Sequence, residues 1–307
     1  DQIPFRDEFI GVKTQSEYLV GKRDTNNVFF GKDDYLIEKH SGVSSDVLER
    51  NYKYLENFLN KSKEMLGENH ASAIIVPTAS NILTDKLPAF ATDFNQNILL
   101  DRMDFDARVP LNTHNQEYIY YKTDHHWTTL GAYYTYMDWA DYMGITPYDD
   151  YKKEMVSDKF YGTLYSKARL VSTTADEMWR YIPNNNAEYT VTYNLGERVE
   201  NTLYNPEKLE VRDKYSYFLN GNNPVVEIKS NNDKQGKLLI VKDSFAHSFA
   251  PFAVNDFAQV DMIDLRYLNY SVVDYIKEHE ITDVLVLYSS VNFAKESNLF
   301  KLDMNNK

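Results

Sequence analysis

The last third of the chain alternates short apolar runs with amphipathic segments. Continuous apolar runs predict buried strands at 237–242, 259–264 and 283–288. Between them, apolar residues at helical spacing predict helices at 245–253 and 271–279. Because strands that alternate with helices form a parallel sheet covered on both faces, this region predicts an α/β fold.

The first half of the chain shows the same rhythm. Apolar positions recur at helical spacing from 44 to 67, between a serine-rich start and a glycine stop. Residues 73–76 predict a buried strand that the following proline ends. A short strand at 118–121 precedes a helix that Thr128 or Thr129 caps.

The segment from 151 to 234 has a different pattern. Its short alternating runs are separated by Asn, Gly and Pro, and they lie at 189–193, 215–219 and 225–228. Alternation with period two predicts antiparallel strands. We therefore expect residues 1–150 and 235–307 to form an α/β domain, and residues 151–234 to form a β-rich insertion or subdomain.

Composition narrows the classes of partner. The 307-residue chain carries a formal net charge of −13, which disfavours nucleic acid and anionic membrane as partners. It has no cysteine, so disulfides and thiolate metal sites are excluded. No apolar stretch approaches the roughly 20 residues of a membrane span. The chain starts at Asp1 without Met, and we expect a removed signal or membrane anchor before it.

Two distant segments carry the residues of a proton relay. In Asp124-His125-His126 the carboxylate stands two residues before an imidazole, so that it can fold back and orient His126 as a base. Ser244 follows the predicted strand 237–242, on a turn at the carboxyl end of the sheet, where reactive groups of α/β proteins collect. The pattern predicts a Ser-His-Asp hydrolase or acyltransferase with the chain order Asp, His, Ser.

Two other interpretations of these residues remain open. Ser244 can simply cap the helix that follows it. Asp124, His125 and His126 can instead bind a divalent metal, but adjacent histidines of a loop point in different directions, and no second carboxylate–histidine cluster lies nearby in the sequence. We therefore expect no metal, and we expect His125 to shape the pocket.

Further candidates follow the other strands. The oxyanion of an acyl-transfer intermediate needs hydrogen-bond donors, and the Ser244 backbone N–H and the Asn292 side chain are candidates. Arg266 and Tyr267 place a cation and an aromatic ring after the strand 259–264, although Arg266 can instead form a structural ion pair. His247 lies one turn beyond Ser244 and can line the cleft.

Several blocks of the sequence resemble one family. The block Tyr120–Tyr134, with its Asp-His-His-Trp motif, resembles the bacterial DHHW-motif proteins, which are similar to the alginate O-acetyltransferase branch of the SGNH hydrolase superfamily. The resemblance covers nearly the whole chain, and its supporting blocks are Phe29–Leu36, Phe160–Tyr165, Lys242–Phe245 and Ile263–Tyr267.

The resemblance implies a flavodoxin-like, three-layer α/β/α sandwich in which the order of the catalytic blocks is permuted. It makes Ser244 the nucleophile, His126 the base and Asp124 the residue that orients it. Asn292 matches the superfamily's oxyanion asparagine, although Ser-Ser-Val-Asn departs from the usual Gly-x-Asn-Asp. The oxyanion glycine has no clear match, and the loop at Arg266 and Tyr267 is the nearest candidate.

The resemblance also implies a function. We expect an extracytoplasmic serine O-acetyltransferase or acetylesterase that acts on a secreted or cell-wall polysaccharide without a cofactor. A membrane acyltransferase partner would supply the acetyl donor, and Trp127 and several tyrosines would stack on sugar rings. The alternatives are a non-catalytic polysaccharide-binding or assembly protein with the same fold, and a metal-dependent hydrolase.

Overall fold

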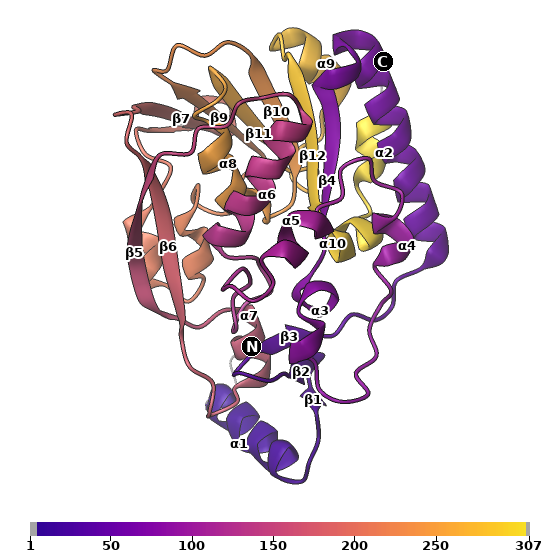
Figure 1. Cartoon of the computed structure of the whole chain (residues 1–307), viewed down its shortest axis with the longest axis vertical. Helices are drawn as coiled ribbons and strands as arrows, with labels where there is room; N and C mark the ends of the chain where they lie inside the picture. The colour runs from indigo at the N-terminus through magenta and orange to yellow at the C-terminus, as the bar shows by residue number, and fades with distance from the viewer. Residues whose placement is uncertain (1–4, 305–307) are drawn as a thin grey trace.

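A central sheet of seven strands organises the molecule (Figure 1). The computed structural model describes residues 5–304. The sheet has the order β4-β12-β10-β11-β9-β7-β8. Its strands are β4 (Ala71–Val76), β7 (Tyr189–Tyr193), β8 (Arg198–Glu200), β9 (Val225–Ser230), β10 (Lys237–Lys242), β11 (Gln259–Ile263) and β12 (Asp283–Ser289).

The four strands from β4 to β11 run parallel, and β9, β7 and β8 continue the sheet in antiparallel pairing. The apolar runs at 237–242, 259–264, 283–288 and 73–76 therefore form strands as predicted. Parallel strands direct all their carboxyl ends to one edge of the sheet, which is where α/β proteins bind ligands.

Each strand of the parallel part is buried on both faces, because successive side chains point in opposite directions. In β10, Leu238 and Ile240 belong to one hydrophobic cluster, and Leu239 and Val241 belong to the other. The first cluster includes side chains of α6 (Thr129–Tyr142) and α8 (Ala246–Ala253). The second includes side chains of α2 (Ser45–Leu66), α9 (Val272–Glu278) and α10 (Ser290–Lys295). The predicted α/β fold with a covered sheet is thus confirmed, whereas the flavodoxin-like three-layer arrangement stays a prediction.

The helix predicted from 44 to 67 is α2, and Gly67 follows it with a φ of 111° that only glycine adopts readily. Thr128 caps α6 as predicted, because its side chain accepts a hydrogen bond from the Gly131 backbone N–H at 3.3 Å. The short strand predicted at 118–121 is only an isolated bridge between Tyr120 and Trp127.

The segment 151–234 contributes to two sheets. Strands β5 (Tyr151–Phe160) and β6 (Asp176–Pro183) form a two-stranded antiparallel ribbon, while β7, β8 and β9 extend the central sheet. The strand predicted at 215–219 is wrong: residues Lys214–Tyr217 form a 3-10 helix, and Leu219 has a positive φ of 52°. Its aromatic residues are buried against Tyr121. Tyr121 begins the loop that carries Asp124, His125 and His126, which we call the histidine loop.

A small lobe lies below the main body in Figure 1. It consists of α1 (Arg6–Leu19), the three-stranded sheet of β1 (Asp24–Thr25), β2 (Val28–Phe30) and β3 (Leu36–Glu38), and α7 (Thr163–Ala168). The remaining helices are α3 (Ala79–Ile82), α4 (Asn97–Leu100) and α5 (Arg108–Thr113), with 3-10 turns at Glu68–His70, Thr84–Lys86, Asn194–Gly196, Pro206–Glu210 and Leu299–Asp303.

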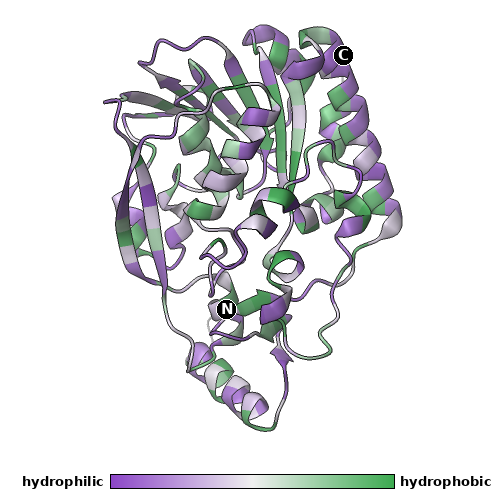
Figure 2. Cartoon of the chain, viewed as in Figure 1, coloured by the Kyte–Doolittle hydropathy of each residue, from purple (hydrophilic) through white to green (hydrophobic). Residues whose placement is uncertain are grey.

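Hydropathy follows this architecture. Figure 2 shows the parallel strands in the middle of the sheet as predominantly hydrophobic and the outer face of α2 as mixed and largely hydrophilic. Within residues 5–304, none of the helices combines the length and the apolarity that crossing a membrane requires.

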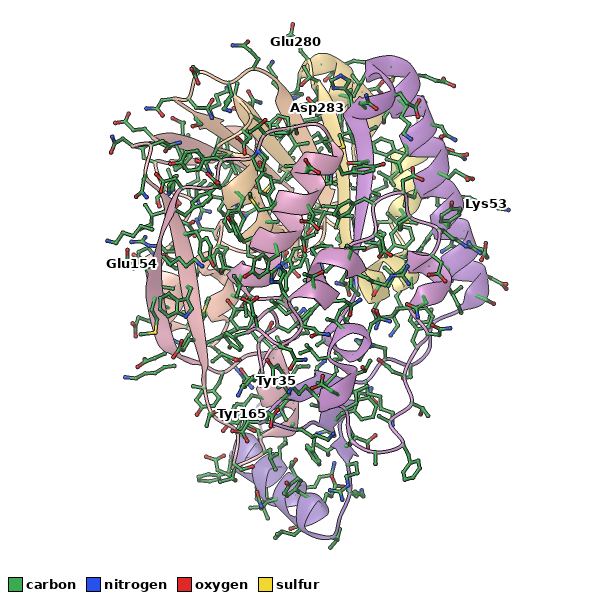
Figure 3. The ribbon with its side chains drawn as sticks, viewed as in Figure 1. Tyr35, Lys53, Glu154, Tyr165, Glu280 and Asp283 are labelled. Carbon is green, nitrogen blue, oxygen red and sulfur yellow. The ribbon has the colours of Figure 1, made fainter. Side chains whose placement is uncertain are left out.

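Burial of α2 against the sheet gives a first prediction. Replacing Leu55, which is 1% exposed, by alanine removes core contacts and is expected to lower the free energy of unfolding by about 2–5 kcal/mol. Lys53, on the same helix, points away from the body in Figure 3, so Lys53→Ala should change that free energy by no more than about 0.5 kcal/mol. Urea unfolding of both variants measures the difference, and similar losses for the two would contradict the assigned packing of α2.

Candidate active site

The loop that carries Ser244 is fixed by the buried carboxylate of Asp243. One oxygen of Asp243 accepts the backbone N–H of Phe245 at 2.9 Å. The other accepts the backbone N–H of Ser289 at 2.9 Å and the side-chain amide of Asn292 at 2.8 Å. The loop after β10 is thereby joined to the loop after β12, and Ser244 stands half-buried at the carboxyl edge of the sheet.

The histidine loop is held in the same way by Asp176, the first residue of β6. This buried carboxylate accepts the backbone N–H groups of Lys122 at 2.7 Å and Thr123 at 2.8 Å. On the other side of the loop, the indole N–H of Trp127 donates to the backbone carbonyl of Phe245 at 3.0 Å. That bond ties the histidine loop directly to the serine loop.

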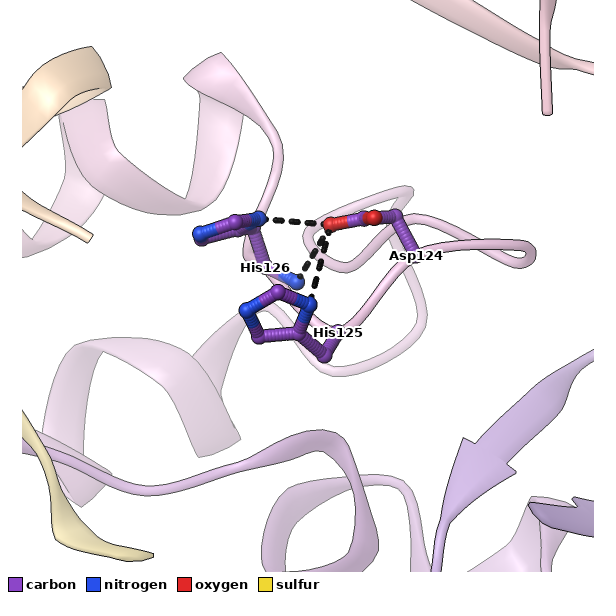
Figure 4. A group of neighbouring side chains, drawn as sticks. All are labelled: Asp124, His125 and His126. Atoms are coloured by element: carbon purple, nitrogen blue, oxygen red, sulfur yellow. Dashed lines mark hydrogen bonds and ion pairs between the residues drawn. The ribbon is translucent and has the colours of Figure 1, made fainter. Parts of the chain in front are cut away.

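The two loops bring Asp124, His126 and Ser244 into one hydrogen-bonded chain. His126 Nδ1 lies 2.6 Å from Asp124 Oδ1, and its Nε2 lies 2.7 Å from Ser244 Oγ. Asp124 Oδ1 also accepts the His126 backbone N–H at 3.1 Å (Figure 4). An ionised Asp124 accepts the proton on Nδ1, so Nε2 is the acceptor for the serine hydroxyl. The predicted relay geometry is present.

Asp124 is buried and yet ionised. Burial would raise the pKa of its carboxyl, but the adjacent His125 and His126 and the hydrogen bonds it accepts hold that pKa well below its usual range. Its second oxygen accepts the backbone N–H of Thr163 at 2.8 Å and the Thr163 hydroxyl at 3.0 Å. Gly162 packs so closely that a β-carbon there would overlap the Asp124 side chain.

The ring of Tyr215 lies flat on the ring of His126, with a centroid distance of 3.7 Å and an interplanar angle of 9°. Its hydroxyl is 3.0 Å from that of Ser248 on α8. Phe245 packs against the same imidazole at 5.0 Å. These contacts leave His126 one orientation, with Nε2 toward Ser244.

His125 lines a small pocket next to the relay. Its Nδ1 is 2.8 Å from the Thr163 hydroxyl, and burial lowers the pKa of its ring. The pocket has a volume of about 30 Å³, and Phe245, Ser289 and Asn292 line its other side. A water-sized group needs about 10–15 Å³ of such space, so the pocket can hold a small group.

Three of the predicted substrate residues are engaged elsewhere. Arg266 forms a two-point ion pair with Asp264, with N···O distances of 2.8 and 2.6 Å, so the structural alternative for Arg266 holds. Trp127 is fully buried and cannot stack on a sugar, which corrects that expectation. His247 is buried and does not line the cleft, because its Nε2 accepts a hydrogen bond from Lys242 at 2.8 Å.

Two candidates keep an accessible position. Asn292 is exposed beside the pocket and uses one amide N–H on Asp243, which leaves the second for a ligand. Tyr267 is 55% exposed, with the Arg266 guanidinium 5.4 Å from its ring centroid. The roles of both residues stay predictions.

Whether a cluster of side chains can bind a metal depends on whether its ligand atoms already make hydrogen bonds. Among residues 5–304, Asp124, His125 and His126 each offer a ligand atom within 4.8 Å of the others, and so do Glu227, Asp261 and His279. In the first group, both Asp124 oxygens and His126 Nδ1 already take part in the hydrogen bonds described above. A metal would have to break these bonds, so the geometry favours the relay.

Sequence reasoning missed Tyr215, Thr163, Gly162 and Asp176. Thr163 and Gly162 lie in the block Phe160–Tyr165, which supports the family resemblance. The sequence thus marks these two residues, but it does not indicate that they contact Asp124. Tyr215 lay inside a segment that was predicted as a strand. Its partner His126 is distant in sequence, and no local pattern predicts that contact.

The fold and the site define an α/β protein in which a buried aspartate, a histidine and a serine are joined in one hydrogen-bonded chain. The chain belongs to the DHHW protein family, whose model matches residues 105–263, more than half of its length. The resemblance drawn from the sequence is thereby confirmed. No curated protein sequence matches the chain significantly.

Solved structures with the same fold include a DHHW family protein from Eubacterium siraeum, which is 24% identical with a TM-score of 0.71 over 92% of this chain and 98% of that one. PatB1 of Bacillus cereus, with a sulfonyl adduct, is 22% identical with a TM-score of 0.71 over 91% and 99% of the two chains. The O-acetyltransferase domain of Pseudomonas putida AlgJ is 13% identical with a TM-score of 0.56 over 91% and 95%.

The tight contact at Gly162 gives a second prediction. Gly162→Ala should push the Asp124 carboxylate away from His126 and Thr163, at a cost of about 1–3 kcal/mol in the free energy of unfolding. Gly11, inside α1, meets no atom closer than 3.5 Å, so Gly11→Ala is the matched control and should not destabilise the protein. Urea unfolding measures both, and an unaffected Gly162→Ala variant would refute the close packing.

The buried Lys242 gives a third prediction. Burial lowers the pKa of Lys242 to about 8, against the attraction of Asp264, while an unfolded lysine titrates near 10.4. Between these values the unfolded chain binds a proton that the folded chain lacks, so the contribution of Lys242 to stability rises with pH.

Compared with Lys242→Met, the wild type should gain roughly 1 kcal/mol in unfolding free energy between pH 8 and pH 9. Taking the difference between the two proteins removes the titration of other groups that they share. Urea unfolding at pH 7, 8 and 9 tests this, with Lys53→Met on the exposed face of α2 as control. A difference that does not grow with pH contradicts the prediction.

Proposed function

We propose that this protein is an extracytoplasmic serine O-acetyltransferase or acetylesterase that acts on a secreted or cell-wall polysaccharide. The observation that carries the proposal is the 2.7 Å contact between Ser244 Oγ and His126 Nε2, with Asp124 2.6 Å from the opposite ring nitrogen. The shared fold with an O-acetyltransferase domain and with PatB1 supports the same class of chemistry.

The reaction follows from the relay. His126 Nε2 takes the hydroxyl proton as Ser244 Oγ attacks the carbonyl carbon of an acetyl donor, and the ionised Asp124 stabilises the resulting imidazolium. Collapse of the tetrahedral intermediate expels the leaving group, which receives that proton, and leaves an acetyl ester on Ser244. A sugar hydroxyl or a water molecule, deprotonated by the same nitrogen, then takes the acetyl group and restores the serine.

Two donors are suited to the oxyanion. The Ser244 backbone N–H makes no hydrogen bond within residues 5–304 and sits on the attacking residue itself. The second amide N–H of Asn292, beside the pocket, is the other.

The size of the pocket supports a short acyl group. A space of about 30 Å³ beside the relay can accommodate the methyl of an acetyl group. The donor would be supplied by a membrane acyltransferase partner, and the polysaccharide would be the acceptor. The net charge of −13 disfavours a strongly anionic partner surface.

A fourth prediction tests the enzyme directly. Ser244→Ala should reduce the cleavage of a chromogenic acetate ester by about 1,000-fold or more, because the nucleophile is removed. Ser157→Ala, in the β5–β6 ribbon, is the serine control and should retain full activity. Phenylmethylsulfonyl fluoride should modify the wild type at Ser244, as read by mass spectrometry of the intact protein and its peptides.

Three outcomes separate the alternatives. Equal background rates of ester cleavage for wild type and Ser244→Ala would contradict the proposal and favour a non-catalytic polysaccharide-binding protein. Activity that a chelator abolishes and Ser244→Ala does not change would indicate a metal-dependent hydrolase. Acetylated sugar formed when an oligosaccharide is added would identify transfer, and free acetate alone would identify hydrolysis.

A further inference from the structure

The helix α1 turns an apolar face to solvent. Figure 1 shows this helix at the lower end of the small lobe, projecting away from the main body. Its inner face is polar: Thr14 is buried there, and Asp7 forms an ion pair with Arg169 at the end of α7. The outer face carries side chains that are 66–80% exposed, namely Phe5, Phe9, Val12, Leu19 and Val20. A surface helix normally turns its apolar face to the core, so the orientation of α1 is reversed.

The exposed face is large enough to be an interface. Its five hydrophobic side chains present roughly 600 Å² to solvent, which is the upper end of what a typical monomer exposes in one patch. Two such patches placed face to face bury roughly 1,200 Å², the lower end of the range for specific protein–protein interfaces. The area therefore fits a reversible contact between two such helices.

The spacing on this face is that of a coiled-coil seam. Alternating steps of three and four residues separate Phe9, Val12, Ser16 and Leu19. These are successive a and d positions of a heptad, and Phe5, the residue before the helix, continues the spacing by one step. The Ser16 hydroxyl donates to the Val12 backbone carbonyl at 2.9 Å, so it adds no unsatisfied donor to the seam. A seam of this kind packs against a second helix.

The charges beside the seam fit a second copy of α1 in parallel orientation. In this heptad Glu8 occupies a g position, while Arg6 and Lys13 occupy e positions. Parallel helices bring each g residue to the e residue five positions further along the partner, so Glu8 of each copy meets Lys13 of the other. Glu8 forms no ion pair within residues 5–304, and the Lys13 ammonium is only 3.9 Å from its nearest carboxylate, on Glu17. An antiparallel pair would instead set the e-position cations of the two copies against one another.

We propose that the exposed face of α1 is a self-association surface through which two copies of this chain form a parallel two-helix dimer. A two-fold axis runs along the seam, so each seam residue faces its own counterpart. The short seam makes the dimer reversible, and the dimer is independent of the chemistry proposed above. An anionic membrane is a poorer occupant, because α1 carries Asp7, Glu8 and Glu17.

Sedimentation equilibrium of the whole chain tests the dimer. Measurements span roughly 1 μM to 1 mM protein. They are made at about 150 mM salt, which screens the repulsion between two acidic copies beyond about 8 Å. The weight-average mass should rise with concentration from that of one chain towards that of two.

A matched pair of valine variants locates the interface. Val12→Lys places two like charges face to face and should raise the dissociation constant about 100-fold or more. Val109→Lys is the control, because Val109 is also helical, on α5, and is 58% exposed against 68% for Val12. It should leave the dissociation constant unchanged. Both side chains are exposed, and circular dichroism of the two variants checks that they are folded.

A charge exchange tests the parallel orientation. Glu8→Lys and Lys13→Glu each replace two attractive pairs by two repulsive ones and should raise the dissociation constant about fivefold. The double variant, Glu8→Lys with Lys13→Glu, recreates the pairs with opposite polarity and should restore the wild-type value within about twofold. Restoration requires that these two positions face each other across the dimer.

Several results would overturn the proposal. These are a wild type that stays monomeric at every concentration, a dimer that Val12→Lys does not weaken, equal weakening by Val109→Lys, and a double charge variant that does not recover. Flotation of the protein with phosphatidylglycerol vesicles, lost in Val12→Lys and without a dimer in solution, would identify a lipid surface as the occupant instead.

Discussion

The whole site depends on the attachment of two loops that are 118 positions apart in the sequence. The indole of Trp127 donates to the carbonyl of Phe245, which places the residue before the tryptophan against the residue before the phenylalanine. His126 and Ser244 are those two residues, and their side chains meet at 2.7 Å. A buried, directional hydrogen bond in a dry core is costly to break, so the relay inherits the rigidity of the core.

Buried aspartates organise several of the loops at this edge of the sheet. Asp124, Asp176, Asp243 and Asp264 each accept at least one backbone N–H from their own or a neighbouring loop. A buried carboxylate is tolerated only when its oxygens are satisfied, and loop N–H groups satisfy them while the loops become ordered. These hydrogen bonds therefore lower the free-energy cost of burying the carboxylates. They also fix the irregular backbone that holds Ser244 and His126.

How much the sequence predicts depends on the range of the interactions. The strands at 237–242 and 283–288 and the helix at 44–67 follow from local periodicity, and the Asp-x-His spacing predicts the contact between Asp124 and His126 because it is local. The stacking of Tyr215 on His126 joins distant segments, so no local pattern predicts it. The alternating aromatic residues around Tyr215 have the pattern of a strand, but they form a 3-10 helix. Trp127 resembled a surface aromatic in the motif, but its burial is decided by Phe245, which only the tertiary structure brings near.

Two residues of β6, Asp176 and Trp179, join the β5–β6 ribbon to the histidine loop. Asp176 begins β6 and accepts the N–H groups of Lys122 and Thr123, directly before Asp124. The hydroxyl of Thr129, at the start of α6, donates to the carbonyl of Trp179 further along the same strand. The histidine loop is therefore held by β6 both before Asp124 and after His126. The support of Asp124 and His126 thus comes from a strand that follows them by about 50 positions in the sequence.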